Sequence, residues 1–206
     1  MKMYDISMEI HPDMPVYKNL ESKKPTFKNV ANFKENSHYE TDLTMNVHSG
    51  THVDFNLHML ADGQTSSDAI LEHYISDARV FDLSFVLESI TKENLTSLAI
   101  RKGDFVIFKT RNSQDEGFNP SFVFVAESAA NYLADIGIKG VGIDALGIER
   151  SQPGHPTHKA LMAKNVIILE GLRLSDVRSG SYTLIALPLK LKGLDASPVR
   201  AILLGN

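Results

Sequence analysis

The segment Lys102-Gly103-Asp104-Phe105-Val106-Ile107-Phe108 predicts a turn followed directly by a buried strand, because four apolar residues follow the turn without interruption. The segment Gly140-Val141-Gly142-Ile143-Asp144 predicts a second strand, which ends in a carboxylate. Between them, residues 126–136 have the apolar spacing of a helix, and Gly137 stands where helices commonly end. A strand, a helix and a strand in this order indicate an α/β fold.

The rest of the chain adds strands and helices that do not strictly alternate. Strands are predicted near 3–10 and at 41–48, 78–82, 166–169 and 182–187, and helices at 66–74, after Thr91 as N-cap, and at 157–164. Incomplete alternation favours a mixed sheet over a doubly wound one. With 206 residues, 43% of them hydrophobic, the chain is long enough for one domain over 1–206 with a buried core.

Composition narrows the classes of partner. The formal net charge of −4 provides no basic field for nucleic acid or an acidic membrane surface. No apolar run approaches the ~18 residues of a membrane span, and the acidic N-terminal segment lacks a secretory signal. We therefore expect a cytoplasmic protein that acts on a small molecule and binds neither nucleic acid nor membrane.

A histidine cluster dominates the sequence, as His48-Ser49-Gly50-Thr51-His52-Val53-Asp54-Phe55-Asn56-Leu57-His58 holds three of the eight histidines. Imidazole and carboxylate suit zinc, manganese or iron, and the chain has no cysteine to compete. Alternate residues of an extended segment share one face, so an extended chain would point His48, His52, Asp54 and His58 the same way. We expect His48, His52 and Asp54 to bind a divalent metal, on a strand that leads into a loop.

Further ligands are expected from a distant segment. Glu170 follows four apolar residues of a predicted buried strand, where an unpaired carboxylate is costly. His158 lies in the first turn of a predicted helix, whose dipole should keep the ring neutral and able to bind metal. His155 precedes a proline and is the weaker candidate. Three other histidines are expected to be ordinary surface or hydrogen-bonded residues: His11, His38 and His73.

The cluster resembles the motif H-x-G-T-H-x-D-x-P-x-H of the cyclase-like metal hydrolases, which include bacterial kynurenine formamidase and isatin hydrolase. The resemblance covers nearly the whole chain. Its other landmarks occur in the same order: Asp5-Ile6-Ser7, Met14-Pro15-Val16-Tyr17, Gly103-Asp104, 140–144, His158, Glu170, Leu187-Pro188-Leu189-Lys190 and 195–201.

The resemblance implies an α/β domain of swivelling β/β/α type, assembled as a homodimer or homotetramer. It implies that His48, His52 and Asp54 bind one zinc or manganese ion. Asp54, His158 and Glu170 would complete a two-metal site, or Glu170 alone would complete a one-metal site. His58 matches the family's catalytic histidine.

The resemblance also has two departures. Asn56 replaces the motif's proline, which should make the loop that carries His58 less rigid. The chain has no tryptophan, although kynurenine formamidases often place one against an aromatic substrate; Tyr17 or Phe33 is expected to take its place.

The expected reaction is hydrolysis of a non-peptide amide by metal-activated water, with His58 as general base and then general acid. An arylformamide is the favoured substrate. The alternatives are a cyclic amide such as isatin, a polyketide-type cyclisation, and a metal-binding domain without turnover.

Overall fold

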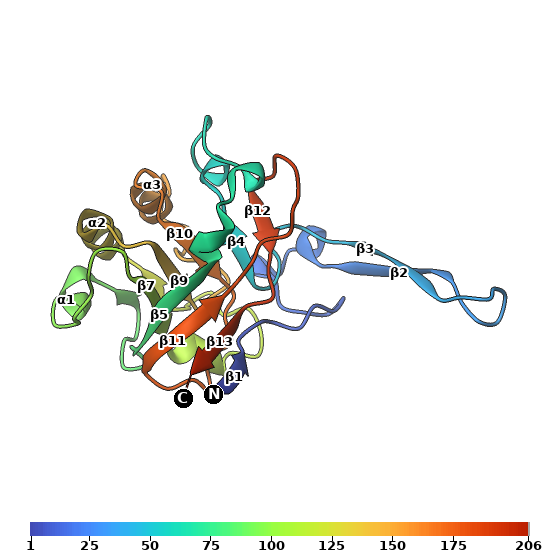
Figure 1. Cartoon of the computed structure of the whole chain (residues 1–206), viewed down its shortest axis with the longest axis horizontal. Helices are drawn as coiled ribbons and strands as arrows, with labels where there is room; N and C mark the ends of the chain where they lie inside the picture. The colour runs from blue at the N-terminus through green and yellow to red at the C-terminus, as the bar shows by residue number, and fades with distance from the viewer. Residues whose placement is uncertain (206) are drawn as a thin grey trace.

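The computed structural model describes residues 1–205, and a nine-stranded sheet forms its centre (Figure 1). The strand order is β1-β13-β11-β5-β7-β9-β10-β4-β12. The strands are β1 (Lys2–Asp5), β4 (His52–Asp54), β5 (Ile75–Asp82), β7 (Phe105–Lys109), β9 (Gly140–Ile143), β10 (Ile167–Glu170), β11 (Gly180–Ile185), β12 (Ala196–Pro198) and β13 (Ile202–Gly205). Neighbours among β5, β7, β9 and β10 are parallel and the other pairs antiparallel, which confirms a mixed sheet.

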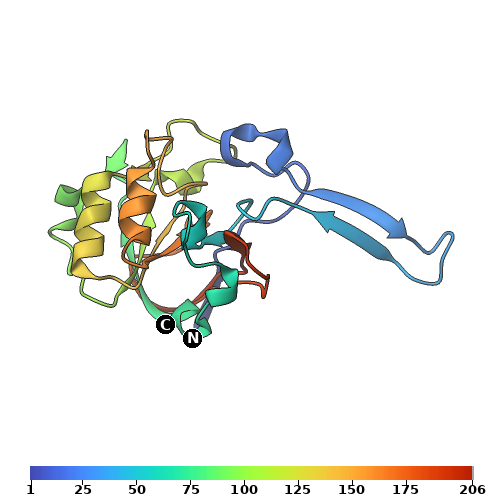
Figure 2. The ribbon, with the colours of Figure 1, turned by 90° about the horizontal axis from the view of Figure 1, so that it is seen from above.

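The buried middle of the sheet explains its apolar sequence, since parallel strands covered on both faces need apolar residues throughout. Along β7, Val106 and Phe108 pack into one core with the helices, whereas Phe105 and Ile107 pack into a second core inside the curl of the sheet. Figure 2 shows the helices α2 (yellow) and α3 (orange) side by side on the outer face of the curled sheet. The helices are α1 (Lys92–Leu95), α2 (Glu127–Ile136) and α3 (Pro156–Met162), and β6 (Ser89–Ile90) pairs with β8 (Phe124–Val125) beside them.

Most of the predicted core elements are confirmed. The strands at 105–108 and 140–143 and the helix that starts after residue 126 lie where the apolar patterns place them. Gly137 ends α2 with a φ of 78°, a left-handed conformation that glycine adopts without a steric penalty. Thr91 caps α1 together with Asn94.

Two predicted elements are wrong in kind. Residues 41–48 do not form a half-buried strand: the strand is β3 (Glu40–Thr44), it is exposed along its length, and a turn follows it. Its alternating sequence belongs to a hairpin outside the body of the protein. Residues 66–74 form two short 3-10 helices, Ser66–Asp68 and Leu71–Tyr74, and no α-helix. Further 3-10 turns are Tyr17–Asn19, Glu21–Lys23, Asn56–His58 and Arg111–Gln114.

A hairpin projects from the body and is called the arm below; it comprises β2 (Thr26–Ala31), β3 and their connection, residues 26–44. Figures 1 and 2 both show it extending away from the sheet. Among residues 1–205, no helix is long and apolar enough to span a membrane.

Candidate active site

Strand β4 positions the first two site residues. His52 and Asp54 lie two residues apart on one face, and Val53 between them packs into the core on the other face. β4 pairs with β10 on one side, where His52 lies opposite Glu170, and with β12 on the other. The period of the strand therefore brings three buried metal-binding side chains together.

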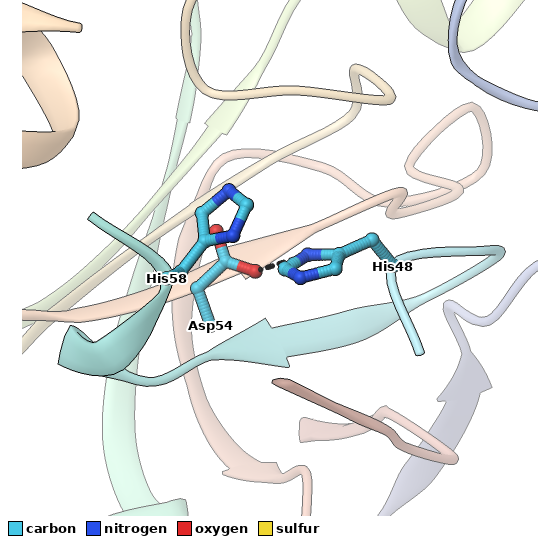
Figure 3. A group of neighbouring side chains, drawn as sticks. All are labelled: His48, Asp54 and His58. Carbon is cyan, nitrogen blue, oxygen red and sulfur yellow. Dashed lines mark ion pairs between the residues drawn. The ribbon is translucent and has the colours of Figure 1, made fainter. Parts of the chain in front are cut away.

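His48 and His58 reach the same place by another route than the one predicted. The segment 48–58 is extended only over β4; His48 lies in the preceding turn and His58 in the 3-10 turn Asn56–His58. Figure 3 shows the two rings on either side of the Asp54 carboxylate. The ring centroids of His48 and His58 are 4.1 Å apart. The expected convergence occurs, but turns produce it where a single extended face was predicted.

The carboxylate of Asp54 lies at the centre, and its two oxygens face different histidines. Oδ1 is 2.9 Å from His48 Nδ1 and 3.3 Å from His52 Nε2. Oδ2 is 3.5 Å from Nε2 of His158, which comes from α3. Glu170 completes the group, because its two oxygens lie 3.4 Å from His52 Nε2 and 3.5 Å from His158 Nε2.

Two acidic residues at the site had no sequence signal. Glu149 is buried and holds α3: one oxygen accepts a hydrogen bond from the His158 backbone N–H at 3.1 Å and lies 3.4 Å from His158 Nδ1. Its other oxygen is 2.7 Å from Nδ1 of His155, which is half-exposed. Asp195, in the loop before β12, lies 2.9 Å from His48 Nε2 and 3.5 Å from His58 Nδ1.

Several buried polar atoms of the cluster have no hydrogen-bond partner. They are His52 Nε2, both carboxylate oxygens of Asp54, and His158 Nδ1. Unpaired buried polar groups cost free energy, so a set of them pointing at one another indicates a ligand that they share. All are nitrogen or carboxylate oxygen, which are the donors that zinc and manganese take. The residues thus fit a divalent metal.

The carboxylates control the charge of the metal-free cluster. Burial lowers the pKa of the His52 ring, but hydrogen bonds to Asp54 and Glu170 outweigh burial and raise it to about 10. Burial and the charge of Asp54 raise the pKa of Glu170, but His158 and His52 hold it down at about 2. The pKa of His158 is well above its ordinary value: burial lowers it, but Asp54, Glu149 and Glu170 raise it more. The prediction that the helix dipole keeps His158 neutral is therefore wrong for the metal-free protein.

His58 differs from the other histidines of the cluster. Burial, together with the charges of His48 and His158, lowers its pKa, although Asp54 and Glu170 act in the opposite direction. A neutral imidazole at neutral pH can accept a proton. His58 also lies close enough to His48 and Asp54 to share a metal with them, so the geometry permits it two roles.

A cavity of about 250 Å³ opens onto the cluster. Tyr17 forms part of its wall and packs edge-on against Phe118 and Phe122, and its hydroxyl lies 2.8 Å from Ser151 Oγ. Phe33 is on the arm and highly exposed, so of the two expected aromatic residues the structure places only Tyr17 at the cavity. The remaining lining residues are Lys23, His48, His58, Met59, Leu146, Gly147, Glu149, Ser151, His155, His158 and Glu170.

Asn56 replaces the motif's proline but ties down its loop. Its side-chain amide donates a 2.7 Å hydrogen bond to Asn165 Oδ1, in the turn before β10, and its carbonyl accepts from Leu60 N at 2.8 Å. The expected loss of rigidity therefore meets a compensating tether. His11, His38 and His73 lie outside the cluster, as expected.

Curated relatives are similar over most of the chain. The kynurenine formamidase of Salinibacter ruber is 37% identical over 150 residues, which are 71% of each chain. The kynurenine formamidase of Sphingopyxis alaskensis is 34% identical over 149 residues, again 71% of each chain.

Solved structures extend the similarity to the whole chain. A structure titled as a predicted metal-dependent hydrolase from Bacillus stearothermophilus is 49% identical with a TM-score of 0.90, covering 98% of this chain and 97% of that one. Isatin hydrolase A from Labrenzia aggregata, at 21% identity and a TM-score of 0.85, covers 98% and 93% and shares the fold. The Cyclase family model matches residues 4–150. With its histidine cluster built on this fold, the chain belongs to the Cyclase family.

Proposed function

We propose that this protein is a metal-dependent amide hydrolase that acts on a small arylformamide. One observation carries the proposal: the two oxygens of buried Asp54 face two separate sets of histidines beside a cavity with an aromatic wall. The kinship with the two kynurenine formamidases supports the amide class of substrate.

His48, His52 and Asp54 would hold one divalent ion, zinc or manganese. Asp54, His158 and Glu170 would hold a second, or Glu170 alone would complete a one-metal site. When bound, such an ion lowers the pKa of water and polarises a carbonyl oxygen. The backbone N–H of Ile148 donates to Glu170 Oε1 and fixes that carboxylate in place.

His58 carries the proton steps. Its Nδ1 faces Asp195 at 3.5 Å, which leaves Nε2 to accept a proton from the attacking water. The same nitrogen then donates that proton to the leaving nitrogen, because an anilide leaves poorly as an anion. The lowered pKa suits the first step, since the ring is neutral at neutral pH. Such general acid–base catalysis is worth roughly 10²–10⁴ in rate.

Tyr17 would take the place of the missing tryptophan as the aromatic contact for the substrate. It is held from behind by Phe118 and Phe122, so its ring presents a fixed surface to the cavity. Aromatic pairs of this kind contribute about 0.5–1.5 kcal/mol beyond simple burial.

A pair of alanine variants tests these roles. His58→Ala should retain the metal and lose about 10²-fold or more in kcat, whereas His52→Ala should lose the metal itself. Metal content by mass spectrometry and turnover of N-formylanilides with zinc or manganese measure both effects. Loss of metal from His58→Ala would make His58 a ligand, and full activity would remove it from the mechanism.

The substrate class is tested with the wild-type protein. Formylanilides should be hydrolysed faster than isatin-type lactams and aryl lactones at equal concentration. Preference for a lactam would reassign the substrate while keeping the chemistry, and metal binding without turnover on any of these compounds would leave a non-catalytic domain.

A further inference from the structure

The arm carries large apolar side chains that its own chain does not cover. Phe33 is 74% exposed, Tyr39 62% and Leu43 55%, and Phe27 and Val30 are nearly half exposed. An isolated two-stranded hairpin is only marginally stable in water, so an arm of this kind needs another surface on which to pack. Apolar groups gathered on one projecting element indicate an interaction site.

The charges of the arm favour a protein surface over a membrane or nucleic acid. Basic and acidic side chains alternate along it and nearly cancel: Lys28, Lys34, Glu35, Glu40 and Asp42. Anionic lipid and nucleic acid are recognised by clustered basic residues, which the arm lacks.

The body of the same chain offers an apolar surface of matching character. Two segments that lie side by side form it, because Ala186 N donates to Tyr74 O at 2.9 Å and Ser66 N donates to Leu194 O at 2.9 Å. Each side chain of this surface, called the receptor patch, is between 37% and 56% exposed: Ile70, Leu71, Ile75, Leu187, Leu189 and Leu194.

We propose that the arm of one copy docks on the receptor patch of a second copy, and that the exchange is reciprocal. Two distinct apolar surfaces on one chain satisfy each other in a two-fold dimer, where each copy gives one arm and receives one. The exposed parts of Phe27, Phe33 and Tyr39 amount to roughly 350 Å² per arm. Two arms, each covering an equal area on the partner, bury on the order of 1,400 Å², within the range of roughly 1,200–2,000 Å² of stable interfaces.

A matched pair of double variants tests the arm. Phe33→Ser with Tyr39→Ser removes two exposed aromatic side chains from it. Phe85→Ser with Leu87→Ser removes two side chains that are 69% and 75% exposed beyond the opposite end of β5 from Ile75. Sedimentation velocity from about 1 to 100 µM should show wild type and the Phe85/Leu87 variant as dimers, and the arm variant with a dimer Kd raised at least 100-fold. Circular dichroism checks that both variants stay folded.

Cross-linking tests the contact itself, since the chain has no cysteine of its own. A mixture of Phe33→Cys and Leu189→Cys proteins, treated with a short bismaleimide, should give a covalent heterodimer, and neither protein alone should cross-link as efficiently. Stronger cross-linking of Phe33→Cys with itself would overturn docking on the receptor patch. A wild type that stays monomeric at 100 µM would overturn the dimer, and its binding to phosphatidylserine vesicles would then assign the arm to membranes.

Discussion

Asp54 shows how a single side chain can organise two sets of ligands. Its oxygens face His48 and His52 on one side and His158 on the other, and none of these atoms is exposed enough for water to satisfy it freely. Sequence spacing placed Asp54 among the ligands, but its central position depends on α3 and β10, which approach it only in the folded chain.

Glu149 is expected to position His158. It accepts from the backbone N–H of His158 and lies 3.4 Å from Nδ1, which leaves Nε2 directed at Asp54. Carboxylates behind metal-binding histidines fix the ring and its tautomer, and their loss typically costs 10–100-fold in metal affinity. Glu149→Gln should therefore weaken metal binding by that factor in isothermal titration calorimetry. The matched control is His155→Ala, which removes the exposed partner of the same carboxylate and should leave the affinity unchanged.

Metal binding should depend on pH through His52. In the metal-free protein its ring keeps a proton up to a pKa of about 10, whereas a metal needs that nitrogen unprotonated. The affinity should rise about tenfold per pH unit for each proton released. The metal-free protein should show the opposite trend. A histidine whose pKa is raised on folding stabilises fully below its unfolded value of 6.5, and that stability is lost as the pH rises towards 10.

Calorimetry in two buffers of different ionisation enthalpy measures the protons released on metal binding. Urea unfolding of the metal-free protein at pH 7 and pH 9.5 measures the second trend. Equal proton release and equal stability at both values would show that His52 is neutral before the metal binds.

Among the elements, the junction of β10 with the turn before β4 has the least room. Gly171 has a φ of 70°, and a Cβ there would lie 2.5 Å from the carbonyl oxygen of Gly50. Gly103 also has a positive φ, 83°, but no atom lies within 4 Å of its added Cβ. Gly103→Ala should cost about 1–2 kcal/mol from backbone strain alone. Gly171→Ala should cost about 1–3 kcal/mol more, because the backbone of Gly50 must move.

Chemical denaturation of both glycine variants gives the difference in stability. Because Gly50 lies between His48 and His52, Gly171→Ala should also weaken metal binding, whereas Gly103→Ala should not. Equal costs for the two variants would show that the junction adapts without strain.

The elements also show where prediction from sequence ends. Uninterrupted apolar runs such as 105–108 encode burial locally, so the central strands could be predicted. The alternation at 41–48 equally fits a strand on a core and a strand on an exposed arm, and only the rest of the fold decides between them. Glu149 follows a turn with no periodic neighbours, and its role arises from contact with α3, so nothing in its spacing could reveal it.

At the scale of the whole molecule, the arm and the site are linked along the chain. Lys23, which lines the cavity, lies three residues before β2, and His48 lies four residues after β3. Ser49 Oγ donates to Lys23 O at 2.6 Å and joins the two ends of the arm next to the cluster. A docked arm would therefore restrain both ends beside the cavity.

The strand order has a consequence for the rates of folding and unfolding. Asp54 and Glu170 are more than 100 residues apart in the sequence, yet they lie on paired strands, β4 and β10. Contacts that close so long a loop form late, since their entropy cost precedes any gain. An ion held by both strands should thus slow unfolding and leave the folding rate nearly unchanged. Stopped-flow chevrons recorded with zinc and with chelator would show the effect in the unfolding arm.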